Sequence, residues 1–158
     1  MNTTEQLAKH IKDVHFGGNW TASNLKEQLE NVNLQQATTK IGDLNTIAVL
    51  VFHINYYANA ITGVLKGKPL EAKDKYSFDL PPLHTEEEWQ ALVAKVLQQG
   101  LELSELVAKL PDSILAADFT DAKYGNYHRN FLGFIEHTHY HLGQISLLKK
   151  LAQTKTSS

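Results

Sequence analysis

Hydrophobic residues recur at helical spacing along four stretches of the chain, and polar or glycine-containing turns separate these stretches. Such spacing places apolar side chains on one face of a helix. It predicts long helices over residues 3–15, 43–66, 85–110 and 126–152. Between the first two helices, Leu25, Leu29 and Val32 keep the helical spacing, but asparagine and threonine interrupt it. We therefore expect short, broken helix in that region.

Polar residues that favour helix N-termini stand at the start of each predicted helix. Thr3 and Gln6 match the capping-box pattern for the first helix, and Asp43 is expected to cap the second. Thr85 is followed by a run of glutamates, which places negative charge at the positive end of the third helix dipole. Asn126 is expected to cap the fourth helix.

The connection over residues 68–83 is longer than antiparallel neighbours in a bundle need. It is long enough to cross the whole bundle, which would leave the second and third helices parallel. Strand signals are few and no internal repeat is present. The sequence predicts an all-α fold, a four-helix bundle with a long crossover between the second and third helices. We expect a single domain over residues 1–153 and a disordered C-terminal tail over residues 154–158.

Composition narrows the classes of function. The 158 residues and 42% hydrophobic content fit one domain with a sizeable core. With a net charge of −2, the chain is too balanced to attract nucleic acid over a broad surface. No apolar run approaches the length of a membrane span or of the hydrophobic part of a secretory signal, so we expect no membrane partner and a cytoplasmic location. The absence of cysteine excludes disulfides, Cys-ligated zinc and a protein thiolate nucleophile.

Three histidines form the candidate chemical site. His137 and His141 stand four positions apart, so they share one face of the fourth helix. His53 lies near the middle of the second helix, and both sets border an apolar face at similar depth. The three imidazoles are expected to meet at a shared seam. They suit a divalent metal ion, zinc or nickel, and leave a coordination position for water or substrate.

The residues alone also allow a second interpretation, in which the three histidines are structural. A histidine that borders an apolar face is usually a hydrogen-bonded structural residue. An i, i+4 pair also arises readily in a chain with eight histidines. We expect His139 to face solvent, and Trp20 and Phe52 to lie in the core. Gly143 is interpreted as a site of close helix packing. The remaining histidines are expected at the surface: His10, His15, His84 and His128.

Other metal sites do not match the sequence. Di-iron bundles need Glu-x-x-His on two helices, whereas this spacing occurs only once, from Glu136 to His139. These two residues are expected to point away from the apolar face of the fourth helix. The patterns of zinc proteases and of covalently bound haem are missing, as are phosphate-binding glycine-rich loops.

Two segments, residues 45–54 (NTIAVLVFHI) and 135–145 (IEHTHYHLGQI), resemble the DinB-like superfamily of bacterial proteins. The resemblance spans nearly the whole chain. It implies a four-helix bundle with a long crossover. It also implies a metal triad of one histidine on the second helix and His-x-x-x-His before Gly-Gln on the fourth, which falls on His53, His137 and His141.

The resemblance leaves the activity open between two classes. Characterised relatives use the metal to activate a low-molecular-weight thiol, such as mycothiol or bacillithiol, and many others have no known reaction. One expectation is a metal-dependent enzyme, a thiol S-transferase or small hydrolase, with Trp20, Tyr56 and Tyr57 shaping a pocket for a small-molecule substrate. The alternative is a non-catalytic, metal-stabilised homodimeric interaction module that uses spare apolar positions on the first or third helix. Asn55, Tyr57 and Gln144 are candidates to orient the ligands.

Overall fold

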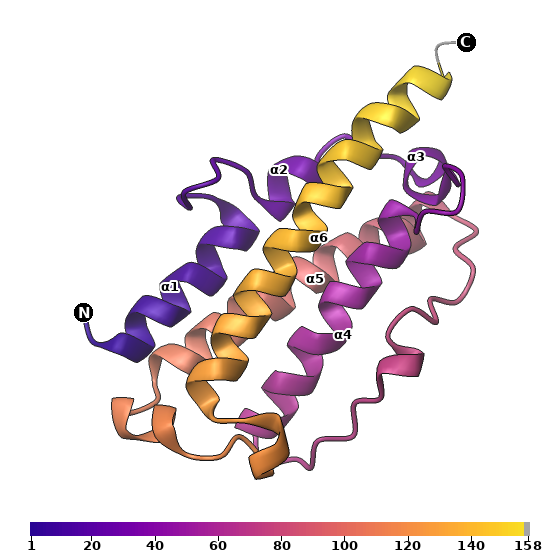
Figure 1. Cartoon of the computed structure of the whole chain (residues 1–158). Coiled ribbons are helices and arrows are strands. Elements are labelled where there is room, and N and C mark those ends of the chain that lie inside the picture. The colour runs from indigo at the N-terminus through magenta and orange to yellow at the C-terminus, as the bar shows by residue number, and fades with distance from the viewer. Residues whose placement is uncertain (157–158) are drawn as a thin grey trace.

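Four long helices packed side by side make up most of the computed structural model, which describes residues 1–156 (Figure 1). They are α1 (Thr3–Phe16), α4 (Ile47–Leu65), α5 (Glu86–Ala108) and α6 (Tyr127–Thr156). The connections contain short helices: α2 (Leu25–Leu29), α3 (Leu34–Thr38), η1 (Asp74–Tyr76), η2 (Asp112–Ala116) and η3 (Ala122–Tyr124). No strand is present within residues 1–156. The predicted all-α bundle and the broken helix between its first two long helices are confirmed.

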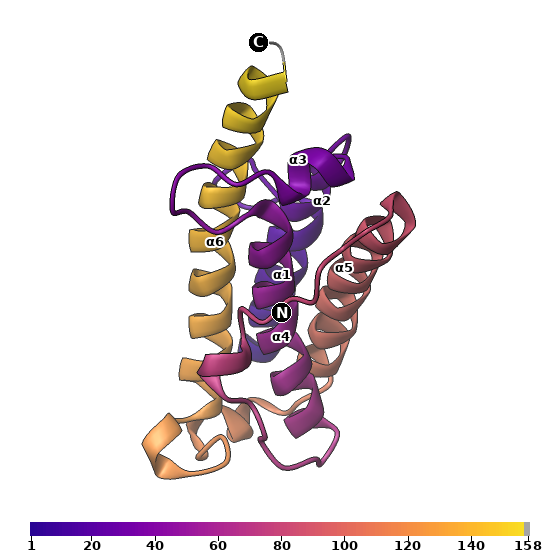
Figure 2. The same cartoon turned by 90° about the vertical axis from the view of Figure 1, so that its right-hand side faces the viewer.

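The topology places α4 and α5 parallel to each other and antiparallel to α1 and α6 (Figures 1 and 2). After α4, the chain returns along the length of the bundle through η1 before α5 begins. The long crossover is therefore confirmed. α1 packs mainly against α5, and α4 contacts both α5 and α6. The interface between α4 and α6 is the seam at which the three histidines were expected to meet.

Two helices begin at residues other than those predicted. Asn2, not Thr3, caps α1, and it forms a capping box with Glu5. Asparagine is at least as good an N-cap as threonine, and it stands one position earlier. Thr46, not Asp43, caps α4, because the chain still turns between residues 41 and 44 before the buried face starts at Ile47.

The other predicted starts are confirmed. Thr85 and Glu88 form the capping box of α5, and the Asn126 side chain accepts a hydrogen bond from the backbone N–H of Arg129. α6 is helical through Thr156, beyond the predicted end at 152. The predicted disordered tail therefore overlaps this helix at residues 154–156, and residues 157–158 lie outside the described part of the chain.

The core is built from the apolar faces that the periodicity predicts. Trp89 of α5 is fully buried and donates a 2.6 Å hydrogen bond from its indole N–H to the carbonyl of Val32, which ties the α2–α3 region to the bundle. The apolar residues that recur at helical spacing on α4 are buried throughout: Ile47, Leu50, Val51, Ile54, Ala58 and Ile61. A stripe of residues on α6 is buried as well: Phe131, Phe134, Thr138, Leu142 and Ile145.

The prediction that Trp20 lies in the core is wrong, because its side chain is 101% exposed. Gly17 and Gly18 have φ values of 108° and 100° and turn the chain away from the end of α1. The following turn is held by its own hydrogen bonds, in which the Asn19 side chain donates to the carbonyls of Asp13 and Ser23. Trp20 projects from this turn into solvent. Phe52 is half-buried rather than in the core.

The prediction that His15 lies at the surface is also wrong, because its side chain is fully buried between α1 and α5. Its ring occupies the space left by Gly100, where an added Cβ would lie 2.3 Å from the ring. Its Nδ1 pairs with the carbonyl of Ile11 at 2.7 Å. Burial lowers the pKa of His15 to about 4. The space arises on α5, so the pattern of α1 could not reveal it.

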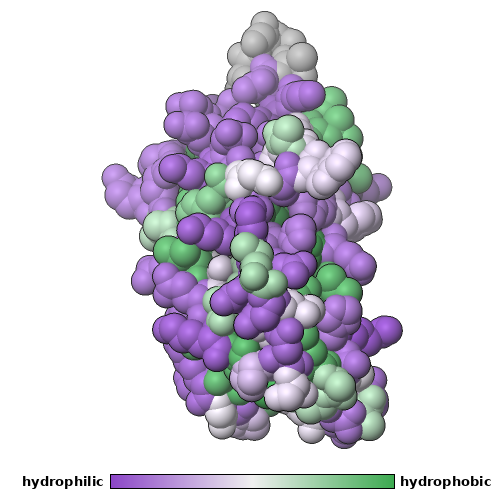
Figure 3. Space-filling model, turned by 90° about the vertical axis from the view of Figure 1, so that its left-hand side faces the viewer, coloured by the Kyte–Doolittle hydropathy of each residue, from purple (hydrophilic) through white to green (hydrophobic). Residues whose placement is uncertain are grey.

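The expected packing role of Gly143 is not found, since this residue is exposed and an added Cβ would meet nothing within 4 Å. His10 and His84 are exposed as predicted, whereas His128 and His139 are half-buried. On the face of the molecule in Figure 3, hydrophobic residues lie scattered among hydrophilic ones.

One helix in the described part of the chain, α4, is long and apolar enough to cross a membrane by length and composition. The sequence-based view that no apolar run reaches this length therefore does not hold. In the structure, 56% of the corresponding window is buried inside the protein, and a buried core helix meets the same criterion. α4 also carries the buried polar residues His53, Asn55 and Thr62.

Candidate metal centre

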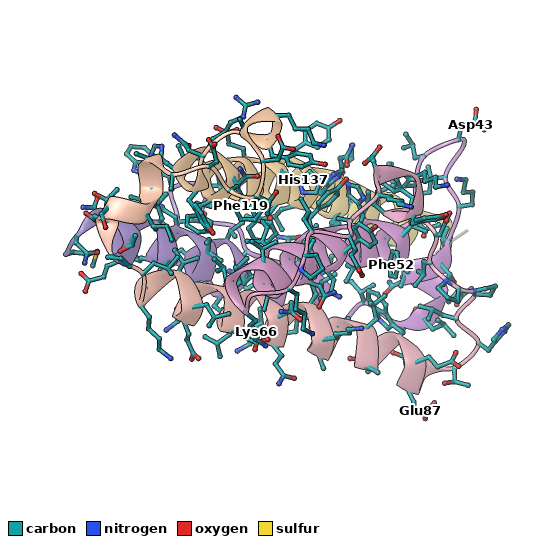
Figure 4. All side chains as sticks on the ribbon, turned by 90° about the horizontal axis from the view of Figure 1, so that it is seen from below. Asp43, Phe52, Lys66, Glu87, Phe119 and His137 are labelled. Carbon is teal, nitrogen blue, oxygen red and sulfur yellow. The ribbon has the colours of Figure 1, made fainter. Side chains whose placement is uncertain are left out.

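The three predicted histidines lie together at the interface of α4 and α6. The side chains of His53 and His141 are 4% and 6% exposed, and His137 is half-buried. His137 and His141 are one turn apart on α6. In Figure 4, His137 lies on the α6 side of α4, opposite to Glu87 on α5.

The Nε2 atoms of the three rings converge. Nε2 of His137 lies 2.9 Å from Nε2 of His53 and 3.1 Å from Nε2 of His141. The three ligand atoms are all within 4.8 Å of one another, so the group could hold a metal ion. The rings are steeply inclined to each other, with interplanar angles of 55° to 87°. The rings therefore meet at their Nε2 atoms instead of stacking face to face.

Acceptors on the far side of two rings fix their orientation. Nδ1 of His53 lies 3.2 Å from the carbonyl of Ser77, and Nδ1 of His141 lies 2.6 Å from Oε1 of Gln144. An N–H at Nδ1 donates to each acceptor, which leaves Nε2 unprotonated and available as a ligand. The orienting role expected of Gln144 is thereby found. Asn55 stands two positions after His53, about 200° around the helix, and faces elsewhere.

The electrostatics keep the three imidazoles neutral. Burial lowers the pKa of His53, His137 and His141 below the ordinary value for histidine. The pKa of His137 falls to about 4, because burial is reinforced by the charges that His141 and His53 would carry. A metal ligand must be a neutral imidazole, so a site that disfavours protonation also favours metal binding near neutral pH.

The crossover supplies part of the site that the sequence reasoning missed. The ring of Phe78 stacks on His53, with 3.8 Å between centroids and 11° between planes. The Tyr57 hydroxyl donates a 2.5 Å hydrogen bond to Asp74, and burial together with this bond raises the pKa of Tyr57 to about 12. Residues 74–78 carry no periodic pattern, so the sequence offered no signal that they cover His53.

An open cleft of about 1130 Å³ begins at the histidines and runs along α6. Its walls are mainly apolar, with Ile61 and Leu70 among the residues that line it, and Phe119 and Phe134 also face it. Of the aromatic residues expected to shape a pocket, Tyr57 lines this cleft. Trp20 is remote in the exposed loop, and Tyr56 instead bonds through its hydroxyl to the backbone of Lys73.

The remaining half-buried histidines take no part in the ligand group. His128 lines the cleft away from the triad, and His139 faces another side of α6. Glu136, which completes the single Glu-x-x-His match, is exposed, as predicted from its position off the core stripe. Among the described residues, the group that could hold a metal is therefore the predicted triad.

The donor set fits a borderline divalent ion. In a tetrahedral zinc site with Zn–N distances of about 2.0–2.1 Å, ligand nitrogens lie ~3.3 Å apart, close to the spacing of His137 from its two partners. Hydrogen bonding within the cluster is limited, because a single N–H at Nε2 of His137 would serve two neighbouring Nε2 atoms, at 2.9 Å and 3.1 Å. A cation would bind the lone pairs of all three nitrogens, and three protein ligands leave a coordination position for water or substrate.

A family model described as the DinB superfamily matches residues 19–145, which include all three histidines. Searches of curated proteins and of solved structures give no match.

Proposed function

Because the chain belongs to the DinB superfamily, we propose that it is a divalent-metal-dependent enzyme that transfers a low-molecular-weight thiol to a small electrophile. The observation that carries this proposal is the convergence of three neutral imidazoles at the inner end of an open, largely apolar cleft. Zinc is proposed as the metal, with nickel next, since both accept three nitrogen ligands.

Each part of the site has a separate role in the proposed reaction. His53, His137 and His141 would hold the ion, which stabilises a bound thiolate and so supplies a nucleophile to a protein without cysteine. Phe78 and the carbonyl of Ser77 hold the ring of His53 in place. The apolar residues that line the cleft would replace water around part of the bound substrate.

The reaction balances without a redox partner. The thiol loses its proton to solvent when it binds. Its sulfur then donates an electron pair to an electrophilic carbon of the second substrate, and a leaving group departs with the electrons of the broken bond. A cytoplasmic location belongs to the same proposal, because thiols are kept reduced there. We propose small molecules rather than nucleic acid or membrane as the partners, in line with the net charge of −2.

Elemental analysis of the purified protein tests the metal. We expect stoichiometric metal in the wild type and its loss in His53→Ala and His141→Ala. His84→Ala, which changes an exposed histidine, is the matched control and should keep the metal. A wild-type protein without stoichiometric metal would refute the proposal.

Turnover assays then decide the reaction class. The metal-loaded protein is incubated with a panel of bacterial thiols and electrophiles, and in parallel with esters and amides. Thiol-dependent product supports the S-transferase. Thiol-independent hydrolysis supports the small-hydrolase alternative, in which the same ion would lower the pKa of bound water.

The second candidate function is a metal-stabilised homodimeric module, and one observation favours it. Tyr140, Leu147 and Leu151 are exposed along one side of α6, a different helix from those expected to carry spare apolar residues. A second copy of the chain would cover this face. Light scattering of wild type and Leu147→Glu tests it: a dimer that dissociates in the variant, with no turnover on any substrate, supports the module.

A further inference from the structure

The cleft follows one face of α6 away from the histidines. Arg129, Gly133, His137 and His141 are spaced four positions apart, so they form a single row along the helix, and all four line the cleft. Eight positions separate Arg129 from His137, which is about 12 Å along the helix axis. The row therefore has a metal-binding end and a cationic end.

Gly133 has no packing reason to be glycine. An added Cβ would meet nothing within 4 Å, and the residue stands in the regular helix of α6 with no positive φ. A glycine inside a helix lowers helix propensity compared with alanine. Its evident consequence in this structure is an open floor of the cleft between Arg129 and His137.

Arg129 is the single arginine of the sequence. Its aliphatic stem packs over Gly125, where an added Cβ would lie 2.6 Å from Cδ of the arginine, so glycine at that turn makes room for the side chain. It takes no part in the ion pairs found among the described residues. A guanidinium outside these ion pairs is well suited to bind a carboxylate through two parallel hydrogen bonds.

Apolar side chains line the cleft between the two ends of the row. Ile61, Leu70 and Phe119 line the cleft there. The carboxylates that also line it are Asp74, which accepts the Tyr57 hydroxyl bond beside His53, and Glu136, which precedes His137. Negative protein charge thus lies at the histidine end, and an anionic ligand group is favoured at the Arg129 end.

We propose that the cleft binds an extended ligand with an apolar middle, which places a carboxylate at Arg129 and a metal-binding atom at the histidines. This inference rests on the proposed function and names the shape and charge of the molecule that the site takes.

The test uses mercaptoalkanoic acids of increasing length, from mercaptopropionate to mercaptoundecanoate, and mercaptoalkanols of the same lengths as uncharged controls. Each is titrated into the cobalt(II)-loaded protein, and the sulfur-to-cobalt absorption band reports binding without any turnover. We expect affinity to rise with length up to a chain that spans at least ~12 Å, because the Arg129 stem leans over Gly125 and away from the histidines. At that length the acid should bind about tenfold more tightly than the alcohol.

Variants test which residues cause the preferences for charge and for chain length. Arg129→Gln should abolish the preference for the acid, and Arg129→Lys should restore part of it. Gly133→Leu should weaken the long ligands at least several-fold while leaving mercaptopropionate unchanged. Ala91→Leu is the control, because Ala91 is an exposed residue of α5 outside the cleft lining, and it should leave the whole series unchanged. Cobalt stoichiometry and circular dichroism establish that each variant is folded and loaded.

The outcomes separate this inference from the proposed function. If thiols bind the cobalt but show no preference for length or charge, or if Arg129→Gln keeps the preference, the extended anionic ligand is refuted and the metal-thiol proposal stands. If the wild type binds no cobalt, or no thiol changes its spectrum, both are refuted.

Discussion

The hydrogen bond that a histidine makes through Nδ1 fixes the direction in which its Nε2 points. At His141 the acceptor of this bond is Gln144. The two atoms, Nδ1 and Oε1, lie 2.6 Å apart. A ring held in this way keeps its tautomer and direction before any metal arrives. Histidine identity and spacing were readable in the sequence, whereas the acceptor could be named only as one of several candidates.

Gln144→Ala tests this role. The variant should bind one metal ion as the wild type does, but with an affinity lower by about 10–100-fold, because the ring of His141 loses its orienting acceptor. Competition with a metal-binding dye measures the affinity. Gln98→Ala, an exposed glutamine on α5, is the control and should match the wild type. An unchanged affinity in Gln144→Ala would show that the hydrogen bond does not tune the site.

His15 makes stability depend on pH. Its pKa is about 4 when folded, against the ordinary 6.5, so the unfolded chain binds a proton that the folded protein refuses. The contribution of His15 to the free energy of unfolding is complete above about pH 6.5. As pH falls toward 4, this contribution is lost, and the loss amounts to about 3 kcal/mol. Urea unfolding of the metal-free protein at several pH values should show His15→Leu losing correspondingly less stability on acidification. An identical loss of stability on acidification in His15→Leu and in the wild type would contradict this role of His15.

At the scale of elements, the crossover is part of the site as well as a connection. Ser77 and Phe78, which follow η1, contact His53. Hydrogen bonds from Tyr56 and Tyr57 fasten this segment to α4. The length of the connection was predictable, because parallel α4 and α5 require a chain that spans the bundle. Its contribution to the site was not, since irregular backbone has no periodicity from which contacts can be inferred.

Phe78→Ala tests the crossover. Loss of the stacked ring should free residues 73–79, so their amide hydrogens should exchange faster while those of α4 keep their protection. Metal affinity should fall by about tenfold, because the ring of His53 is less constrained. Tyr76→Ala removes an exposed aromatic residue from the same segment and serves as the control. Equal exchange rates in both variants would contradict the proposed role of Phe78.

For the whole molecule, the triad would join two helices that are far apart in sequence. α4 and α6 meet at the histidines, so an ion bound there would stabilise the folded state over the unfolded chain. At a metal concentration 100 times the Kd, this linkage contributes about 2.7 kcal/mol.

Thermal unfolding measures that linkage. We expect Tm to rise by roughly 5–10 °C on metal loading, since each kcal/mol shifts the Tm of a domain of this size by about 2–4 °C. Chelation should reverse the rise, and His53→Ala should show none. A rise of the same size in His53→Ala would place the stabilising metal elsewhere.

The sequence by itself determined what depends on local spacing. The four long helices, the buried faces of α4 and α6, the capping box at Thr85 and the pairing of His137 with His141 all follow from periodicity and from residue chemistry within a few turns. These features form wherever an amphipathic helix has a core to cover, so their signal is present in the chain itself.

Only the tertiary structure decided what meets across the bundle. Gly100 on α5 made room for His15, a turn after α1 left Trp20 in solvent, and the crossover brought Phe78 onto His53. The row from Arg129 through Gly133 to His137 became a cleft because other elements wall it. Each of these contacts joins residues from separate segments, whose relative placement is fixed by packing and has no periodic trace in either segment.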